Sequence, residues 1–302
     1  MIRNIRNPQS LALALALSVS LLALPSLAAD RDIDETVSAD ATGTVAIENI
    51  AGSIEVIGWD RDEVQVKGTI SGDVVGVEIS AGKRVQIEVE YPRNQKNMRG
   101  EADLVIHVPA GSNVMVECIT ATVEVSGVSG RVQAESISAG VMVEGDCSEV
   151  SAESISGDVL VNCPQASEVN VGSISGSVEA TGGTADVRAE AISGPIDLTF
   201  DKFLNLSVEA LSGRVTVTGD LDSAGRFDFE LHSGRLLLTV PADVDAEFSV
   251  ETFSGGIDNA FGQKSRKTSK YTPNRELDFT NGNGSARVDI ETFSGDVILK
   301  KN

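Results

Sequence analysis

A short motif recurs along most of the chain, and this repeat limits the possible folds more than any other feature. Its common form is Glu-x-Ile/Leu/Phe-Ser-Gly followed by x-apolar-x-apolar. Copies without gaps cover residues 153–161, 172–180, 190–198, 209–217, 230–238, 251–259 and 291–299, and degenerate copies cover 48–56, 117–125 and 135–143. The motif Ser falls at 138, 156, 175, 193, 212, 233 and 254, so each step is 18 to 21 residues long. A unit this short cannot bury its apolar side chains alone and must stack on its neighbours.

Each repeat contains two segments that alternate apolar and polar residues, which is typical of strands with one buried face. One segment follows the Ser-Gly corner and the other precedes the next corner. The residues expected in the core are aliphatic at first and aromatic later, as in Val132, Val150, Val169 and Val187, then Phe227 and Phe248. The sequence therefore predicts an all-β, single-stranded β-solenoid with two short strands per turn and a rise of about 4.8 Å per turn.

Two interruptions of the repeat set the expected organisation of the chain. Residues 60–113 still alternate as strands, and we expect residues 40–113 to form antiparallel strands that cap the first turn. Regular turns should then occupy 114–258, followed by a long loop and a C-terminal turn at 259–302, all within one domain spanning 30–302. The late interruption carries a basic cluster, which we interpret as a possible partner-binding loop; its basic residues are Lys264, Arg266, Lys267 and Lys270.

The first 29 residues have the pattern of a Sec signal peptide. Arg3 and Arg6 precede an apolar run from Leu11 to Leu24 and an A-x-A-like end at Ala28. We expect export to the periplasm or the cell surface, and no transmembrane segment in the mature chain. Removing two Arg from a formal charge of −21 leaves −21 − 2 = −23. Nucleic acid and anionic lipid are therefore excluded as partners, whereas a cationic partner, a divalent metal or a neutral glycan is compatible.

The repeats also carry a family resemblance. Residues 49–60, residues 102–111 and the serial Ser-Gly corners resemble the bacterial putative-adhesin β-strand repeat family, a domain of unknown function. The resemblance extends over residues 40–302. It implies an exported, right-handed, β-helix-like protein without established catalytic residues.

An acidic residue stands three positions before most motif Ser residues, with Gly172 as a gap. The members of this set are Glu135, Glu153, Glu190, Glu209, Glu230, Glu251 and Glu291, with Glu117 in register before Thr120. Stacked carboxylates repel, and close packing would raise their pKa values. The column could be a solvated outer face, a set of caps for the Ser-Gly corners, or a stripe that binds calcium or another cationic ligand.

The three cysteines allow at most one intramolecular disulfide. Cys147 and Cys163 lie on the same side of successive turns and could be bridged, while Cys118 replaces a corner Ser. His107 and His232 are interpreted as structural rather than as metal ligands or catalytic bases.

No familiar catalytic motif is present in the sequence, and regular spacing of acids favours a scaffold over an active site. We therefore expect a non-enzymatic protein without a cofactor that presents an acidic face to a protein or glycan of the envelope or surface. One alternative is a polysaccharide lyase or hydrolase, by analogy with other β-helices. The other is a periplasmic accessory protein that binds cations.

Overall fold

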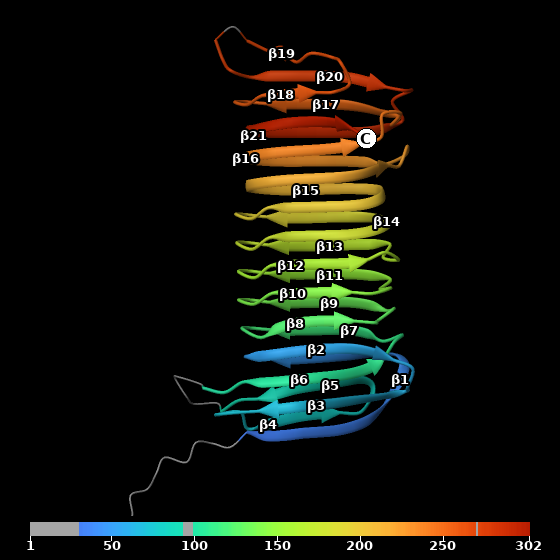
Figure 1. Ribbon diagram of the computed structural model, residues 1–302, viewed down its shortest axis with the longest axis vertical. Helices are drawn as coiled ribbons and strands as arrows, with labels where there is room; N and C mark the ends of the chain where they lie inside the picture. The colour runs from blue at the N-terminus through green and yellow to red at the C-terminus, as the bar shows by residue number, and fades with distance from the viewer. Residues whose placement is uncertain (1–29, 93–98, 270) are drawn as a thin grey trace, which may run out of the picture.

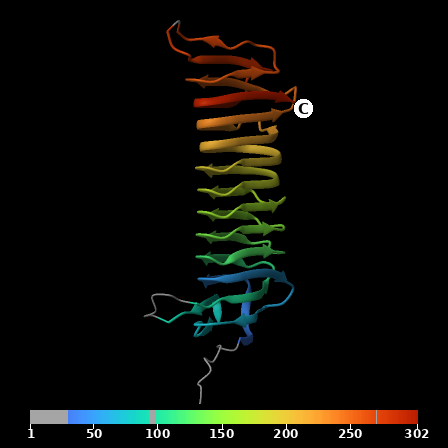
Figure 2. The ribbon, with the colours of Figure 1, turned by 60° about the vertical axis from the view of Figure 1, so that its left-hand side comes forward.

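The computed structural model describes residues 30–92, 99–269 and 271–302, and in these ranges the chain is all β, as expected. Twenty-one strands form one continuous sheet that coils into a tall stack of layers (Figures 1 and 2). The predicted signal peptide at 1–29 and the basic residue Lys270 lie outside the described residues. No helix that could cross a membrane occurs in the described part of the chain.

The regular turns lie in the middle of the stack, and their strands pair in parallel with the equivalent strands of the next layers. One series runs β7–β9–β11–β13–β14 and the other β8–β10–β12–β14. The bounds are β7 Asn113–Cys118, β8 Thr122–Ser126, β9 Arg131–Ser136, β10 Val141–Glu144, β11 Glu149–Ser154, β12 Val159–Cys163, β13 Glu168–Ser173 and β14 Val178–Ala191. Every motif position thus meets the same position of the neighbouring repeat.

Later turns differ from the predicted two short strands, because the two segments of a turn join into one. The long strands are β15 Ile196–Leu221, β16 Arg226–Val240 and β21 Ala286–Lys301. Pairing continues through the corner here, with Gly213 opposite Gly234. Both glycines have positive φ values, 142° and 123°, which let the backbone turn without leaving the ladder.

At the N-terminal end the first repeat is not the outermost layer. The strands are β1 Arg31–Asn49, β2 Gly52–Trp59, β3 Glu63–Ile70, β4 Gly76–Ser80, β5 Gly82–Glu90 and β6 Ala102–Pro109. β1 and β2 lie between the regular turns and the parallel strands β5 and β6. Antiparallel pairing joins β1 to β3, β3 to β6 and β4 to β5, so this region is mixed rather than purely antiparallel.

The C-terminal end does not follow chain order either. β21, which carries the last repeat, is inserted between β16 and β17 (Figure 1). The remaining strands are β17 Ala246–Thr252, β18 Ile257–Asn259, β19 Arg266–Lys267 and β20 Arg275–Asn281. β20 pairs antiparallel with β17, and the short basic strand β19 pairs antiparallel with β20.

The core is a column of stacked apolar side chains, as the sequence predicts. Val132, Val150, Val169 and Val187 occupy equivalent buried positions in successive layers. Near the C-terminus Phe227 and Phe248 fill this column, and Phe248 stacks on Phe279 with ring centroids 4.6 Å apart. The stack therefore buries a narrow but continuous core, although aromatic residues make up only 4% of the chain.

The Ser-Gly corners bring the backbones of neighbouring layers into contact. A Cβ atom on Gly157, Gly176 or Gly194 would lie 1.8 to 2.0 Å from a carbonyl oxygen of the layer below. The buried Ser154 hydroxyl accepts a hydrogen bond from the Gly157 amide (2.9 Å) and donates one to the Ala139 carbonyl (3.0 Å). Serine hydroxyls, not the column of Glu carboxylates, therefore cap these corners.

The Gly176→Ala substitution tests this close stacking. The added Cβ would meet the Gly157 carbonyl oxygen at 2.0 Å, so two backbones must move apart. We expect a loss of about 2–3 kcal/mol of stability, seen as a lower midpoint in a circular dichroism thermal melt. Gly172→Ala is the control, since its Cβ would meet neighbours at 3.7 Å or more. Equal losses in the two variants would show that corner contact does not govern stability.

Candidate interaction groove

The acidic residues of the repeat form one continuous column on the outside of the stack. Glu117, Glu135 and Glu153 are directly paired in successive layers, and Gly172 separates Glu153 from Glu190. The column extends beyond the regular repeats at both ends. In spatial order its carboxylates belong to Glu78, Glu88, Glu48, Glu117, Glu135, Glu153, Glu190, Glu209, Glu230, Glu291, Glu251 and Glu276.

A row of exposed apolar side chains runs beside this acidic column, two residues further along each repeat. A large apolar residue usually turns inward, yet Ile155 remains 44% exposed and its equivalents are similar. The exposed members are Ile119, Ile137, Ile155, Ile174, Ile192, Leu211, Phe253 and Phe293. His232 occupies the same row and stacks on Phe293, with ring centroids 5.1 Å apart. We call these residues the apolar row.

Both rows face outward because of strand alternation at the corner. In the segment Glu153-Ser154-Ile155 the middle side chain is buried, so the two flanking side chains project to solvent. The same arrangement in every layer produces a groove of about 1830 Å³ that is lined by Glu carboxylates and by the apolar row. It extends from Glu88 and Tyr91 at one end to Thr268 and Arg275 at the other.

Electrostatic repulsion and burial act on the acidic column. The pKa of Glu153 is raised, first by burial and then by the charges of Glu135 and Glu190. Arg188 compensates part of the column, since its guanidinium lies 2.7 Å from Glu190 and 3.3 Å from Glu209. Among the described residues, no ion pair reaches Glu117, Glu135, Glu153, Glu230, Glu251 or Glu291.

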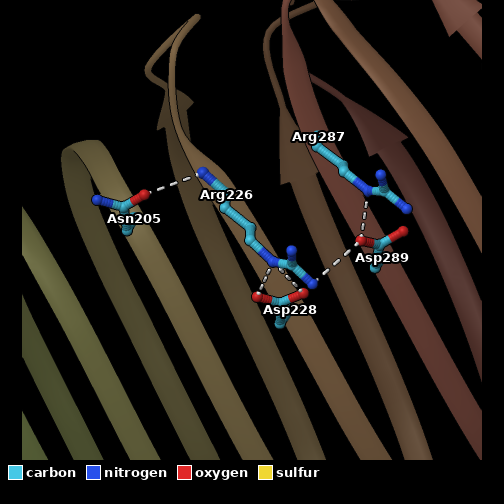
Figure 3. Close-up of polar contacts among 5 residues, drawn as sticks. All are labelled: Asn205, Arg226, Asp228, Arg287 and Asp289. Carbon is cyan, nitrogen blue, oxygen red and sulfur yellow. Dashed lines mark hydrogen bonds and ion pairs between the residues drawn. The ribbon is translucent and has the colours of Figure 1, made fainter.

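Two acids in a neighbouring outer column of the same sheet face, Asp228 and Asp289, are paired with arginines. Arg226 Nε donates to both carboxylate oxygens of Asp228 (3.0 and 2.7 Å), and Arg287 Nε donates to Asp289 (2.8 Å) (Figure 3). Arg226 also lies 3.7 Å from Asp289, and its amide N–H donates to Asn205 Oδ1 (3.0 Å). These two acids have basic partners, whereas Glu230 and Glu291, which lie beside them in the groove, have no ion pair among the described residues.

The carboxylates of the predicted calcium stripe form a column in successive layers, interrupted at Gly172. Within residues 30–92, 99–269 and 271–302, no three His, Cys, Asp or Glu side chains come together in a group that could hold a metal ion. Calcium binding by Glu135, Glu153, Glu190, Glu209, Glu230, Glu251 and Glu291 stays a prediction.

The basic cluster lies at the C-terminal end of the groove. Arg266 contacts Glu276 (2.9 Å) and Asp278 (3.3 Å), so its charge is already paired within the chain. Lys264 and Lys267 are exposed, and the neighbouring Thr268 lines the groove.

The cysteines and His107 lie at structural positions. Cys147 and Cys163 are joined by a disulfide between adjacent turns, with Cα atoms 5.8 Å apart. Cys118 is free and buried in the column that contains Ser136 and Ser154, and burial raises the pKa of its thiol to about 12. The buried His107 Nδ1 has no hydrogen-bond partner and its ring packs 5.0 Å from Trp59, away from the groove.

The acidic column was predicted from the sequence, whereas the apolar row was not. The signal was available, because Ile155, Ile174, Ile192, Leu211 and Phe253 occupy one column of the repeat. A strict alternation from Glu153 outward would have placed Ser154 inside and Ile155 outside.

A protein-family model described as Toastrack DUF4097 matches residues 60–300, which is most of the chain. No curated protein matches the sequence.

Solved structures that match the chain include a putative adhesin from Parabacteroides merdae, with 11% identity, a TM-score of 0.36, and 89% of this chain and 96% of that chain covered. A putative adhesin from Bacteroides fragilis has 9% identity and a TM-score of 0.31, with 89% of this chain and 97% of that chain covered. A putative cell adhesion protein from Clostridium sporogenes has 10% identity and a TM-score of 0.23, with 91% of this chain and 100% of that chain covered.

Neutralising one carboxylate of the column should stabilise the protein. The pKa of Glu153 is raised in the folded state, so above that pKa the ionised carboxylate lowers the free energy of unfolding. This loss disappears as the pH falls below the pKa of the unfolded chain, about 4.3, because the carboxyl is then protonated in both states. Glu153→Gln should therefore gain about 0.5 kcal/mol at pH 7, and the gain should shrink toward pH 4 in thermal melts. Glu144→Gln is the control, since Glu144 pairs with Ser126 and Asn162. A destabilised Glu153→Gln variant at pH 7 would contradict the repulsion argument.

The buried thiol of Cys118 should be unreactive in the folded protein. With a pKa near 12 and little solvent contact, it should not react with a thiol reagent at pH 8, whereas one thiol per chain should react after unfolding without reductant. The Ile119→Cys variant serves as the control. Ile119 is the next residue and is 44% exposed, so a cysteine at this position should react at once. Fast labelling of native Cys118, detected by intact mass, would contradict its placement in the core.

Proposed function

The chain belongs to the Toastrack DUF4097 family, and from this premise we propose that it is an exported, non-catalytic, adhesin-like protein that holds an envelope or cell-surface partner in its groove. The observation that carries the proposal is the groove itself, in which unpaired carboxylates run alongside exposed apolar side chains over many layers. Exposed apolar surface on this scale is unusual unless a partner covers it.

The even spacing of the acids supports the non-catalytic part of the proposal. General acid–base chemistry needs two groups whose environments differ, so that one is protonated while the other is ionised. The carboxylates of the column instead recur once per layer in similar surroundings, as Glu117, Glu135 and Glu153 do. Such a surface suits an elongated partner better than a single reacting bond.

Export is supported by the amino-terminal sequence and by the Cys147–Cys163 disulfide, which is typical of oxidising compartments. Following the family resemblance, we also propose that the coil is right-handed and that the strands before residue 113 protect its N-terminal end. Protection of that end would prevent the stack from pairing edge to edge with other chains.

The experiment is fractionation of cells that express the full chain with a C-terminal tag, followed by binding of the purified protein to isolated envelopes. We expect export, retention on envelopes, and at least about tenfold weaker retention for the triple variant Ile137→Ser, Ile155→Ser and Ile174→Ser. Met142→Ser is the control, because Met142 is similarly exposed (38%) but lies outside the groove. Cytoplasmic location, or equal retention of both variants, would contradict the proposal.

A further inference from the structure

We propose that the groove binds a cationic amphipathic α-helix of a partner polypeptide, an inference that rests on the proposed function and names the chemistry of the partner. The groove presents two different surfaces side by side, so its partner must satisfy both. The acidic column requires positive charge, and the apolar row requires apolar side chains next to that charge.

Charge complementarity favours a basic partner strongly. Of the twelve carboxylates of the column, only Glu190, Glu209 and Glu276 have an ion pair among the described residues, which leaves nine without one, and the formal charge of the chain is −21. Anionic lipid and nucleic acid would be repelled by the same column. A purely cationic chain would leave the apolar row exposed, and a purely apolar one would desolvate carboxylates such as Glu135 and Glu153 without pairing them. Lysine and arginine adjacent to leucine-like side chains meet both requirements.

The spacing of the two rows favours a helix over an extended chain. The layers rise about 4.8 Å each, which is close to the 5.4 Å pitch of an α-helix and shorter than the roughly 6.8 Å between same-side residues of a strand. On a helix, residues three and four apart are neighbours, with about 5–6 Å between their Cβ atoms, so a basic and an apolar stripe can run side by side on one surface. A strand sends alternate residues to opposite sides, so it could not place a basic and an apolar row against Glu153 and Ile155 together.

The middle of the column is already partly neutralised, which gives a gain-of-binding test. Arg188 pairs with Glu190 and Glu209 and lies on the lining of the groove. Its removal would release two carboxylates without touching the core, since Arg188 is exposed. The Arg188→Ala variant should therefore bind a cationic helix more tightly than the native chain does.

The test uses fluorescence anisotropy with a labelled synthetic peptide of about 24 residues, built from Leu and Lys at helical spacing so that its helix spans about 36 Å. A peptide of the same composition in scrambled order and a helical Leu/Glu peptide are the controls. We expect the Leu/Lys helix to bind the full chain at least about tenfold more tightly than either control peptide. Arg188→Ala should strengthen binding by about threefold, and the affinity should fall as salt is added.

Variants of the protein separate the two surfaces. The pair Glu135→Gln and Glu153→Gln, and the triple variant Ile137→Ser, Ile155→Ser and Ile174→Ser, should each weaken binding by about tenfold or more. Glu144→Gln and Met142→Ser, on the same layers but outside the groove, should leave it unchanged. Equal binding of helical and scrambled peptides, or weaker binding by Arg188→Ala, would overturn the proposal. Envelope retention that depends on the apolar row, without binding of the peptide, would reject the cationic helix and leave the proposed function standing.

Discussion

The contact between backbones at the Ser-Gly corners is the constraint on which the rest of the structure depends. Gly176 lies so close to Gly157 that no side chain fits between them, and each layer must sit directly on the one before it. Parallel pairing then keeps every motif position in register over the height of the stack. A difference of one residue in this register would exchange the core and the surface. The corner therefore fixes both the buried column and the outer rows.

Strict register has an electrostatic consequence. Any residue type kept at one outward position of the repeat becomes a continuous column, whether or not that arrangement is favourable. Elsewhere on the same face the chain alternates charges, as Arg226 with Asp228 and Arg287 with Asp289 do (Figure 3). In the groove it keeps carboxylates in adjacent layers, and the raised pKa of Glu153 reflects the resulting cost. Repulsion between carboxylates along the whole column is readily explained when a partner of opposite charge binds over the column.

Much of this architecture could be predicted from the sequence, because the alternation of apolar and polar residues within each repeat indicates its strands and its corner. The stacked strands, the core residues from Val132 to Phe248 and the acidic column all follow from period and alternation. The positions of β5, β6 and β21 could not be predicted, since the repeat specifies which residues align but not which layers are neighbours. The apolar row could have been predicted from strict alternation, but the polarity of Ser154 argues against an inward position; its hydroxyl is satisfied there by hydrogen bonds to Gly157 and Ala139.

The most direct test of the central claim is carboxylate footprinting of the protein on isolated envelopes. A carbodiimide label read by mass spectrometry compares each acid in the free and the retained protein. If the groove is the interaction surface, Glu117, Glu135 and Glu153 should be protected on envelopes, while Glu144, on the same layers but outside the groove, should be labelled as in the free protein. Protection of Glu144 with continued labelling of the column, or equal labelling at all four positions, would contradict the account.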